Sequence, residues 1–345
     1  MIQICPNCKS ENFVEARSCS SCGLQLDVAD DLHGIHPEAD TPPLEALEIG
    51  STFAERYEVQ EELGHGGMGK VYRVKDLKSS EELALKLLKP EISADRHTIE
   101  RFSYELNIAR HITHENICRL FHLGEAKNSY YITMELVRGD NLCCFISDKP
   151  DIPLARVFGI ALQTCEGLAE AHKHAIVHRD LKSSNIMVDK TGHTWIMDLG
   201  IARSFGAGLS SEKGVKIGTP AYMAPEQVAG KVSDPRADIY SLGIILFEMV
   251  TGTVPFQGKS PLEISAKHIN ELPPEPQDLN PQVPDSLNAL ILICLEKDVN
   301  KRFQSIDEVR AEVRRIAGDL LVVPEKSTVS GLKKFFRAFR SKKID

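Results

Sequence analysis

The fold of this chain is decided by the stretch His178-Arg179-Asp180-Leu181-Lys182-Ser183-Ser184-Asn185. Short apolar runs at 176–177 and 186–188 flank it, and this pattern predicts a polar loop between two strand edges. An Asp, a Lys and an Asn at these offsets can serve phosphoryl transfer. The Asp would orient and deprotonate a hydroxyl, the Lys would face the moving phosphoryl group, and the Asn would hold a magnesium ion.

A second aspartate follows at the end of another apolar run. Trp195-Ile196-Met197 predicts a strand, and Asp198-Leu199-Gly200 comes directly after it. A carboxylate at this strand end would hold the metal ion that bridges the phosphates of a nucleotide. The two stretches resemble signatures of the serine/threonine protein kinases, namely the catalytic loop and the metal-binding triplet, with Leu199 in place of the usual Phe.

The resemblance implies a bilobal kinase fold of the α+β class at residues 57–317. A small β-rich lobe with one main helix would precede a large helical lobe. MgATP would bind between the lobes, and Mn²⁺ could replace Mg²⁺. The family also carries further motifs in a set order, so the rest of the chain tests the resemblance.

A glycine-rich turn lies where the family carries its nucleotide loop. Leu63-Gly64-His65-Gly66-Gly67-Met68-Gly69-Lys70-Val71-Tyr72 places four glycines between apolar residues. Glycine lets the backbone approach phosphate oxygens closely and present its N–H groups to them. The pattern also occurs in dinucleotide-binding folds, but there a helix follows, whereas here Val71 opens a second predicted strand. The residues Gly66-Gly67-Met68-Gly69 in this turn are similar to those of bacterial members of the family.

Two charged residues are expected to meet behind this loop. Lys86 interrupts the apolar strand Leu83-Ala84-Leu85-Lys86-Leu87, either as an edge-strand charge or as the cation that neutralises the α and β phosphates. The helix predicted over 101–112 places Glu105 beside its apolar face, where a carboxylate needs a cation. An exposed helical glutamate is the alternative. The resemblance implies a Lys86–Glu105 ion pair that assembles the active kinase.

The segment 130–137 alternates apolar and polar residues, and by resemblance it is the last small-lobe strand with the connector to the large lobe. The resemblance implies that adenine bonds to backbone groups near Glu135 and Val137, with Met134 at the back of the pocket. The implied ATP-binding residues are Leu63, Gly64, His65, Gly66, Gly67, Met68, Gly69, Val71, Ala84, Lys86, Glu105, Met134, Glu135, Val137 and Met187. The implied catalytic residues are Asp180, Lys182, Asn185 and Asp198.

A polar, glycine-bearing loop runs from Gly200 to Gly218-Thr219-Pro220, and loops of this length inside a domain are often functional. Arg179 is a cation that a phosphate on this loop could engage, which would order the segment. Ser210 or Ser211 suits such a regulatory phosphosite. Thr219 suits it less well, because it matches a threonine that in the family bonds the catalytic Asp and Lys.

Further family landmarks follow the loop. Ala224-Pro225-Glu226 resembles the triplet that ends it, and Glu226 would form a structural ion pair with Arg302. Asp238 opens a buried apolar helix, and the family uses this residue to brace the backbone of the catalytic loop. A helix predicted over 158–175 would pack beneath that loop, and we assign no chemistry to its His172.

Residues 1–26 carry two cysteine pairs, Cys5-Pro6-Asn7-Cys8 and Cys19-Ser20-Ser21-Cys22. Four thiolates complete a tetrahedral Zn²⁺ shell with no open position, so the site would be structural and would supply the folding energy of this short segment. The segment resembles a zinc ribbon. A redox dithiol or unpaired surface cysteines are the alternatives, and a redox pair normally lies in a larger βαβ context.

Two further segments flank the predicted kinase domain. The acidic, proline-bearing residues 27–50 predict an extended, mobile linker. In the tail, 318–345, the segment Leu332–Arg340 places apolar residues at i, i+3, i+4 and i+7 opposite basic ones. Such a helix can lie on an anionic membrane surface or dock on a partner. A short helix folded back on the kinase domain, or disorder, is the alternative.

The bulk composition narrows the class of protein. A length of 345 residues predicts about two domains, and 42% hydrophobic with 26% charged residues is typical of a soluble globular chain. The net charge of −8 argues against nucleic-acid binding. No run of about 18 apolar residues and no secretory signal is present in this sequence. We therefore expect a cytoplasmic protein, or one held peripherally at the membrane.

The set of motifs predicts an enzyme that transfers the γ-phosphoryl group of ATP to Ser or Thr hydroxyls of proteins. Autophosphorylation of the loop in a transient homodimer would accompany this activity. A pseudokinase scaffold typically lacks one of Lys86, Asp180 or Asp198, and all three are present. A small-molecule phosphotransferase is the other alternative, but the long loop fits a protein substrate better. Lys182 and Thr219 favour Ser/Thr over Tyr as acceptor.

Overall fold

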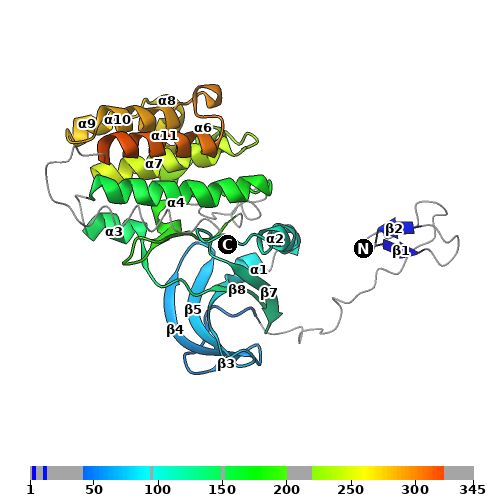
Figure 1. The fold of residues 1–345 in the computed structure, drawn as a ribbon. Helices are drawn as coiled ribbons and strands as arrows, with labels where there is room; N and C mark the ends of the chain where they lie inside the picture. The colour runs from blue at the N-terminus through cyan, green and yellow to red at the C-terminus, as the bar shows by residue number, and fades with distance from the viewer. Residues whose placement is uncertain are drawn as a thin grey trace.

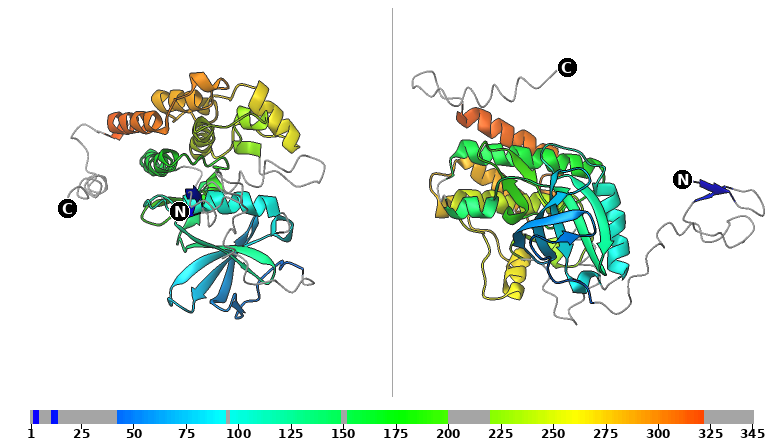
Figure 2. Two further views of the ribbon diagram at one scale, coloured as in Figure 1. Left: turned by 90° about the vertical axis from the view of Figure 1, so that its right-hand side faces the viewer. Right: turned by 90° about the horizontal axis from the view of Figure 1, so that it is seen from below.

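The computed structural model describes residues 2–4, 11–13, 42–93, 96–148, 152–199 and 220–321. Residues 42–321 of this set form two lobes, one built on an antiparallel sheet and one built of helices, which lie one above the other in Figure 1 and in the left view of Figure 2. This arrangement agrees with the α+β class and the two lobes expected from the sequence. Among the described residues, no helix combines the length and apolarity that a membrane span requires.

The small lobe contains a six-stranded antiparallel sheet in the order β3-β4-β5-β6-β8-β7. Its elements are β3 (Thr52–Phe53), β4 (Tyr57–His65), β5 (Gly69–Asp76), β6 (Glu82–Leu88), α1 (Pro90–Ser93), α2 (Arg96–Ala109), β7 (Leu120–Ala126) and β8 (Ser129–Glu135). Helix α2 buries Ile99, Leu106 and Ala109 in one apolar cluster with residues of β6 and β8. The 3.6-residue spacing of these side chains explains why this stretch is a helix.

A second apolar cluster of the sheet is completed by residues that precede the first strand. Leu47 is 9% exposed and belongs to this cluster together with Phe53, while Leu44 packs against it. The Leu47 amide donates to the Tyr72 hydroxyl at 3.0 Å, and the Leu44 amide donates to Ser129 Oγ at 2.6 Å. We expected residues 27–50 to be a mobile linker. For residues 42–50 this is wrong, because Leu44 and Leu47 are held against the sheet.

The large lobe is organised around the buried helix α7 (Arg236–Thr251) and the long helix α4 (Leu154–Lys173). Its other elements are β9 (Asp140–Asn141), α3 (Leu142–Asp148), η1 (Ser183–Asn185), β10 (Ile186–Val188), β11 (Thr194–Ile196), η3 (Pro220–Tyr222), α6 (Pro225–Val228), α8 (Pro261–Asn270), α9 (Pro276–Leu279), α10 (Asp285–Cys294), η4 (Val299–Lys301) and α11 (Ile306–Leu321). Near the N-terminus, β1 (Ile2–Ile4) pairs with β2 (Glu11–Phe13).

The chain reverses sharply between α4 and the catalytic stretch. Ala175 has a φ of 58°, and the Ile176 amide donates back to the carbonyl of Ala171 at 3.0 Å. The turn at 174–175 therefore ends the helix after Lys173, and Ile176 and Val177 lie beyond it without pairing as a strand, contrary to the strand edge expected there. The strands expected at 186–188 and 195–197 are present as β10 and β11, which pair antiparallel, and β11 covers Thr194–Ile196, so that Met197 lies just after it.

Candidate active site

Asp238 holds the backbone of the stretch that begins at His178. Its carboxylate is fully buried in the first turn of α7, where it accepts from the His178 amide at 2.8 Å and from the Arg179 amide at 2.9 Å. Arg179 has a φ of 64°, a region that residues with a side chain rarely occupy. The two bonds stabilise this strained backbone, and the bracing role expected for Asp238 is confirmed.

His172 is a third partner of the same carboxylate. Its Nε2 lies 2.8 Å from Asp238 Oδ2, and its side chain is only 10% exposed. Burial alone would raise the pKa of Asp238, but the hydrogen bond and charge of His172 lower it below the ordinary value. Sequence reasoning missed this histidine, because nothing in a helical pattern indicates which residue of a distant helix a side chain will meet.

His178 connects the two aspartate motifs. Its Nδ1 accepts from the Asp180 amide at 3.4 Å, which leaves Nε2 to donate to the carbonyl of Met197 at 2.9 Å. The Met197 amide in turn donates to the carbonyl of Asn185 at 2.8 Å. These bonds fix the residue directly before Asp198 against the stretch that carries Asp180.

Three of the predicted catalytic residues lie in mutual contact. Lys182 Nζ is 2.7 Å from Asp180 Oδ2, and Asn185 Nδ2 donates to the same oxygen at 3.2 Å and to the Asp180 carbonyl at 2.9 Å. The Asp180 and Lys182 side chains are 24% and 21% exposed. An ionised carboxylate in this arrangement is oriented from two sides and still reaches solvent, so it can accept a proton from a hydroxyl.

The fourth predicted catalytic residue, Asp198, is paired with a lysine from the other lobe. Lys86 Nζ, on β6, lies 2.7 Å from Asp198 Oδ2, with side chains 7% and 25% exposed. Burial alone would raise the pKa of Asp198, but the charge of Lys86 and its hydrogen bond lower it below the usual value. Asp198 also has a φ of 55°. Glu105 lies half-buried on α2, and its pairing with Lys86 stays a prediction.

Most of the predicted nucleotide-binding residues lie on strands and turns of the small lobe, and Met187 lies on β10 of the large lobe. Ala84 and Met134 are buried partners on β6 and β8, and the half-buried Met68, Val71 and Val137 pack against the same apolar cluster. The other predicted residues lie on β4 (Leu63, Gly64, His65), in the β4–β5 turn (Gly66, Gly67), at the start of β5 (Gly69), at the end of β8 (Glu135) and on β10 (Met187).

The glycine turn closes with a hydrogen bond from the Gly66 amide to the Gly69 carbonyl at 2.8 Å. At Gly69 a Cβ would lie 1.8 Å from the carbonyl oxygen of Leu87, so a side chain cannot be accommodated there. At Gly66 and Gly67 a Cβ would meet no atom within 4 Å. The turn is thus anchored at Gly69 and has open space beside Gly66 and Gly67, where a phosphate could approach the backbone.

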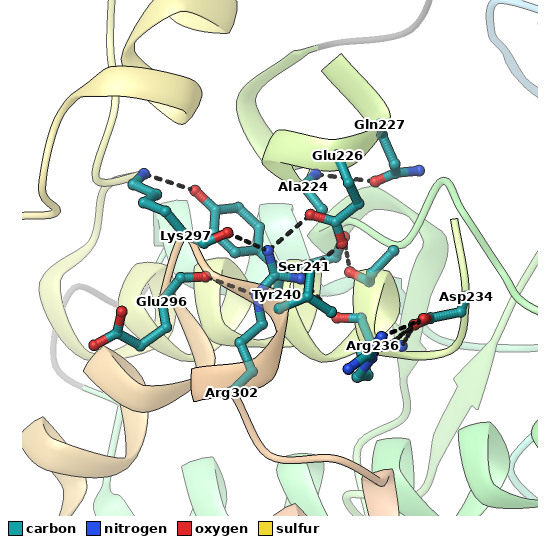
Figure 3. Close-up of polar contacts among 12 residues, drawn as sticks. Ala224, Glu226, Gln227, Asp234, Arg236, Tyr240, Ser241, Glu296, Lys297 and Arg302 are labelled. Atoms are coloured by element: carbon teal, nitrogen blue, oxygen red, sulfur yellow. Dashed lines mark hydrogen bonds and ion pairs between the residues drawn. The ribbon is translucent and has the colours of Figure 1, made fainter. Parts of the chain in front are cut away.

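The predicted pair of Glu226 and Arg302 is confirmed as a buried, two-bond contact, with distances of 2.7 and 2.8 Å (Figure 3). The Arg302 side chain is fully buried, and its Nε donates to the carbonyl of Glu296 at 2.7 Å. Gln227, next to Glu226, donates to the carbonyl of Arg179 at 2.9 Å. This cluster therefore supports the far side of the catalytic stretch.

Several predicted sites lie outside the described residues. They are the cysteines Cys5, Cys8, Cys19 and Cys22, the loop hydroxyls Ser210, Ser211 and Thr219, and the tail segment Leu332–Arg340. Within the described ranges, no group of three or more His, Cys, Asp or Glu side chains is arranged to hold a metal ion. The zinc, phosphosite and tail predictions therefore stay predictions.

The two lobes and the contact of Lys86 with Asp198 between them agree with the bilobal kinase class expected from the sequence. A family model described as protein kinase domain matches residues 57–312. The chain therefore belongs to the protein kinase family.

The similar proteins include bacterial serine/threonine kinases. A probable serine/threonine-protein kinase of Clostridium perfringens is 36% identical over 271 residues, which are 79% of this chain and 40% of the relative. Serine/threonine-protein kinase PrkC of Bacillus subtilis is 34% identical over 266 residues, 77% of this chain and 41% of that protein. The chain thus spans about two fifths of the length of these relatives.

A solved structure agrees with the fold. The crystal structure of the Mycobacterium tuberculosis PknI kinase domain superposes with a TM-score of 0.65 at 28% sequence identity. The superposition covers 79% of this chain and 100% of that domain.

Proposed function

We propose that this protein is an ATP-dependent protein kinase that transfers the γ-phosphoryl group to Ser or Thr hydroxyls of protein substrates. The observation that carries the proposal is the 2.7 Å contact between Lys86 and Asp198, next to the oriented group of Asp180, Lys182 and Asn185. The names of the bacterial relatives support Ser/Thr as the acceptor class.

The oxygen atoms present fit a hard divalent cation. Asp198 has a partly exposed carboxylate whose pKa lies below the ordinary value, so it is ionised at neutral pH. Asn185 uses its amide nitrogen to bond Asp180, which leaves its carbonyl oxygen for a metal. Both side chains would hold Mg²⁺ or Mn²⁺. A bound ion supplies positive charge that offsets the charge on the phosphate oxygens.

The protein's own groups would divide the remaining tasks. Lys86 would bind the α and β phosphates, and the N–H groups of the turn at 64–69 would bind the outer phosphates. Asp180 would orient the acceptor hydroxyl and take its proton, since Lys182 and Asn185 fix the Asp180 carboxylate. Lys182 would then stabilise charge on the phosphoryl group in transfer.

Incorporation of radiolabelled phosphate from γ-labelled ATP into the protein and a generic acceptor protein tests this function. We expect labelling by the parent chain and a loss of at least about a hundredfold in the Asp180→Asn variant. Asp278→Asn is the matched control, because Asp278 is exposed on α9. Equal labelling by Asp180→Asn and the parent chain would remove Asp180 from the mechanism. ATP binding without transfer by the parent would favour a scaffold.

We further infer that the loop before η3 is regulated by phosphorylation, with Ser210 or Ser211 as acceptor. Arg179 lies half-buried at the catalytic stretch, where a phosphate on the loop could reach its guanidinium. Mapping of phosphosites by mass spectrometry after autophosphorylation tests this. Phosphate confined to other residues, or none, would contradict it.

We also propose that Cys5, Cys8, Cys19 and Cys22 bind one Zn²⁺, because the two Cys-x-x-Cys pairs supply four thiolate ligands. Zinc content by native mass spectrometry should be one per chain and should vanish when Cys5 and Cys8 are both replaced by Ser.

For the tail, we propose that Leu332–Arg340 binds anionic membrane. Equal pelleting of the intact and tail-deleted protein with anionic vesicles would refute that proposal.

A further inference from the structure

A buried histidine lies where α8 approaches η3. His268 of α8 has no exposed surface, and its Nδ1 is 2.9 Å from the Tyr240 hydroxyl of α7. The imidazole ring packs edge-on against Phe256 at 4.8 Å and against Tyr240 at 5.7 Å between centroids. The orientation of the ring is therefore fixed on two sides.

The contact of Lys297 with Tyr240 determines which ring nitrogen of His268 carries the hydrogen. Lys297 Nζ lies 3.2 Å from the Tyr240 hydroxyl (Figure 3), and an ammonium can only donate. The hydroxyl thus accepts from Lys297 and keeps its own proton to donate to His268 Nδ1. Burial, followed by the charge of Lys297, lowers the pKa of His268 to about 4, so the ring is neutral at pH 7 and carries its hydrogen on Nε2.

That Nε2–H group is buried and has no hydrogen-bond partner among the residues that the structure describes. Buried donors are nearly always satisfied, so an orphan of this kind needs an explanation. The carbonyl of Ala221, in η3, is close enough to the ring to raise the pKa of His268 against the effect of burial. The Ala221 carbonyl could therefore accept a hydrogen bond from His268 Nε2 after a small movement of η3 toward α8.

The rest of η3 is already tied to the catalytic stretch. The Tyr222 hydroxyl lies 2.9 Å from Ser183 Oγ and 2.8 Å from Glu248 Oε2. The Tyr222 carbonyl accepts from Ser241 Oγ at 2.9 Å. Because Ser183 directly follows Lys182, a shift of η3 toward α8 would be transmitted to residues at the reaction centre. Tyr222 is thus held by these hydrogen bonds, whereas the Ala221 carbonyl is not hydrogen-bonded to His268 Nε2.

We propose that His268 is a positioning residue for the acceptor polypeptide, and that its Nε2–H bonds the Ala221 carbonyl when a polypeptide lies across η3. The bond would fix the backbone at 220–222, which the Tyr222 hydroxyl ties to Ser183 next to Lys182. This role rests on the proposed kinase function. His268 touches neither the acceptor nor the nucleotide, and it acts through η3.

Two substitutions test the hydrogen bonds of His268 Nδ1 and Nε2 separately. Asn places an amide near the Nδ1 position, so His268→Asn keeps a partner for Tyr240 and loses the group that faces Ala221. Gln places its amide near the Nε2 position, so His268→Gln keeps a donor for Ala221 and loses the Tyr240 bond. The 345-residue chain with each substitution is compared with the parent by steady-state kinetics, using radiolabelled ATP and myelin basic protein.

We expect His268→Asn to raise the KM for the protein acceptor about tenfold while the KM for ATP stays within about twofold. His268→Gln should lower the thermal midpoint of unfolding and leave the acceptor KM within about twofold. A purely structural histidine would instead make both variants lose acceptor affinity in proportion to their loss of stability. That result, or an unchanged acceptor KM in His268→Asn, overturns the proposal.

A direct binding measurement keeps the two proposals apart. Fluorescence anisotropy of labelled myelin basic protein reports acceptor affinity in the presence of ADP, without any transfer. If the parent chain transferred no phosphate, the proposed function would fail. The anisotropy difference between the Asn and Gln variants would still decide the role of His268, since equal affinities would overturn it.

Discussion

The Lys86 ammonium on β6 of the small lobe lies 2.7 Å from the Asp198 carboxylate that follows β11 in the large lobe. The two lobes therefore share a charged contact in the region assigned to the nucleotide phosphates. We predict that Lys86→Met lowers kcat/KM for ATP at least about a hundredfold, because a preorganised cation is lost. Lys70→Met, on the neighbouring strand β5, is the control. Comparable losses in both variants would contradict a specific role for Lys86.

The brace at Asp238 yields a prediction about stability. Asn in its place keeps one acceptor oxygen, so one of the two amides of His178 and Arg179 would face an N–H group. We expect Asp238→Asn to lower the free energy of unfolding by about 2–4 kcal/mol, because a buried donor loses its partner. Urea denaturation measures this, with the exposed Asp307→Asn as control. A loss no larger than that of the control would exclude the bracing role.

The buried pair of Glu226 and Arg302 should show strong coupling. Arg302→Met leaves the Glu226 carboxylate buried without its cation, which costs about 3–5 kcal/mol. The double variant Glu226→Gln/Arg302→Met should recover part of this loss, because it removes the uncompensated charge. A double-mutant cycle of unfolding free energies measures the coupling. Additive losses would show that the two side chains act independently.

Acid sensitivity is expected at Asp76. The hydrogen bonds from Arg56, at 3.0 and 2.7 Å, hold the pKa of this carboxyl well below its usual range. The unfolded chain has an Asp pKa of about 3.9, so this stabilisation is complete above that pH and is lost as the pH falls toward the lower folded-state pKa. In Arg56→Met the loss of unfolding free energy between about pH 5 and pH 3 should be smaller. An identical pH slope in both proteins would refute this.

The contact of residues 42–50 with the sheet can be tested at two neighbouring positions. Leu47 is 9% exposed, whereas Ile49 is 61% exposed. We expect Leu47→Ala to lower the free energy of unfolding by about 2 kcal/mol, because buried methyl groups leave a cavity. Ile49→Ala should change it by less than about 0.5 kcal/mol. If both substitutions were neutral, this segment would not contribute to the stability of the small lobe.

The sequence was most informative where chemistry restricts the choice of residue. Phosphoryl transfer restricts the residue types at Asp180, Lys182 and Asn185, and the three side chains that the sequence singled out lie in mutual contact. The partners of Lys86 were less predictable. Its contact with Asp198, 112 residues away, was not indicated by the sequence, and the pairing with Glu105 stays a prediction.

Contacts that depend on packing were not predictable. His172 and His268 carry no pattern that distinguishes them from solvated histidines, because their roles depend on Asp238 and Tyr240 of a distant helix. The segment at 42–50 was misjudged for a similar reason. Acidic residues and prolines are frequent across 27–50, and the apolar contact with the sheet depends on two leucines, Leu44 and Leu47.

Anchoring at Leu44 and Leu47 has a mechanical consequence for whatever precedes Pro42. The bonds from Leu44 to Ser129 and from Leu47 to Tyr72 fix the point on the small lobe to which the upstream polypeptide is connected. A module carried there would move with the small lobe in any movement of the two lobes relative to each other. A load applied upstream of Pro42 would therefore act first on the small lobe, which carries the glycine turn.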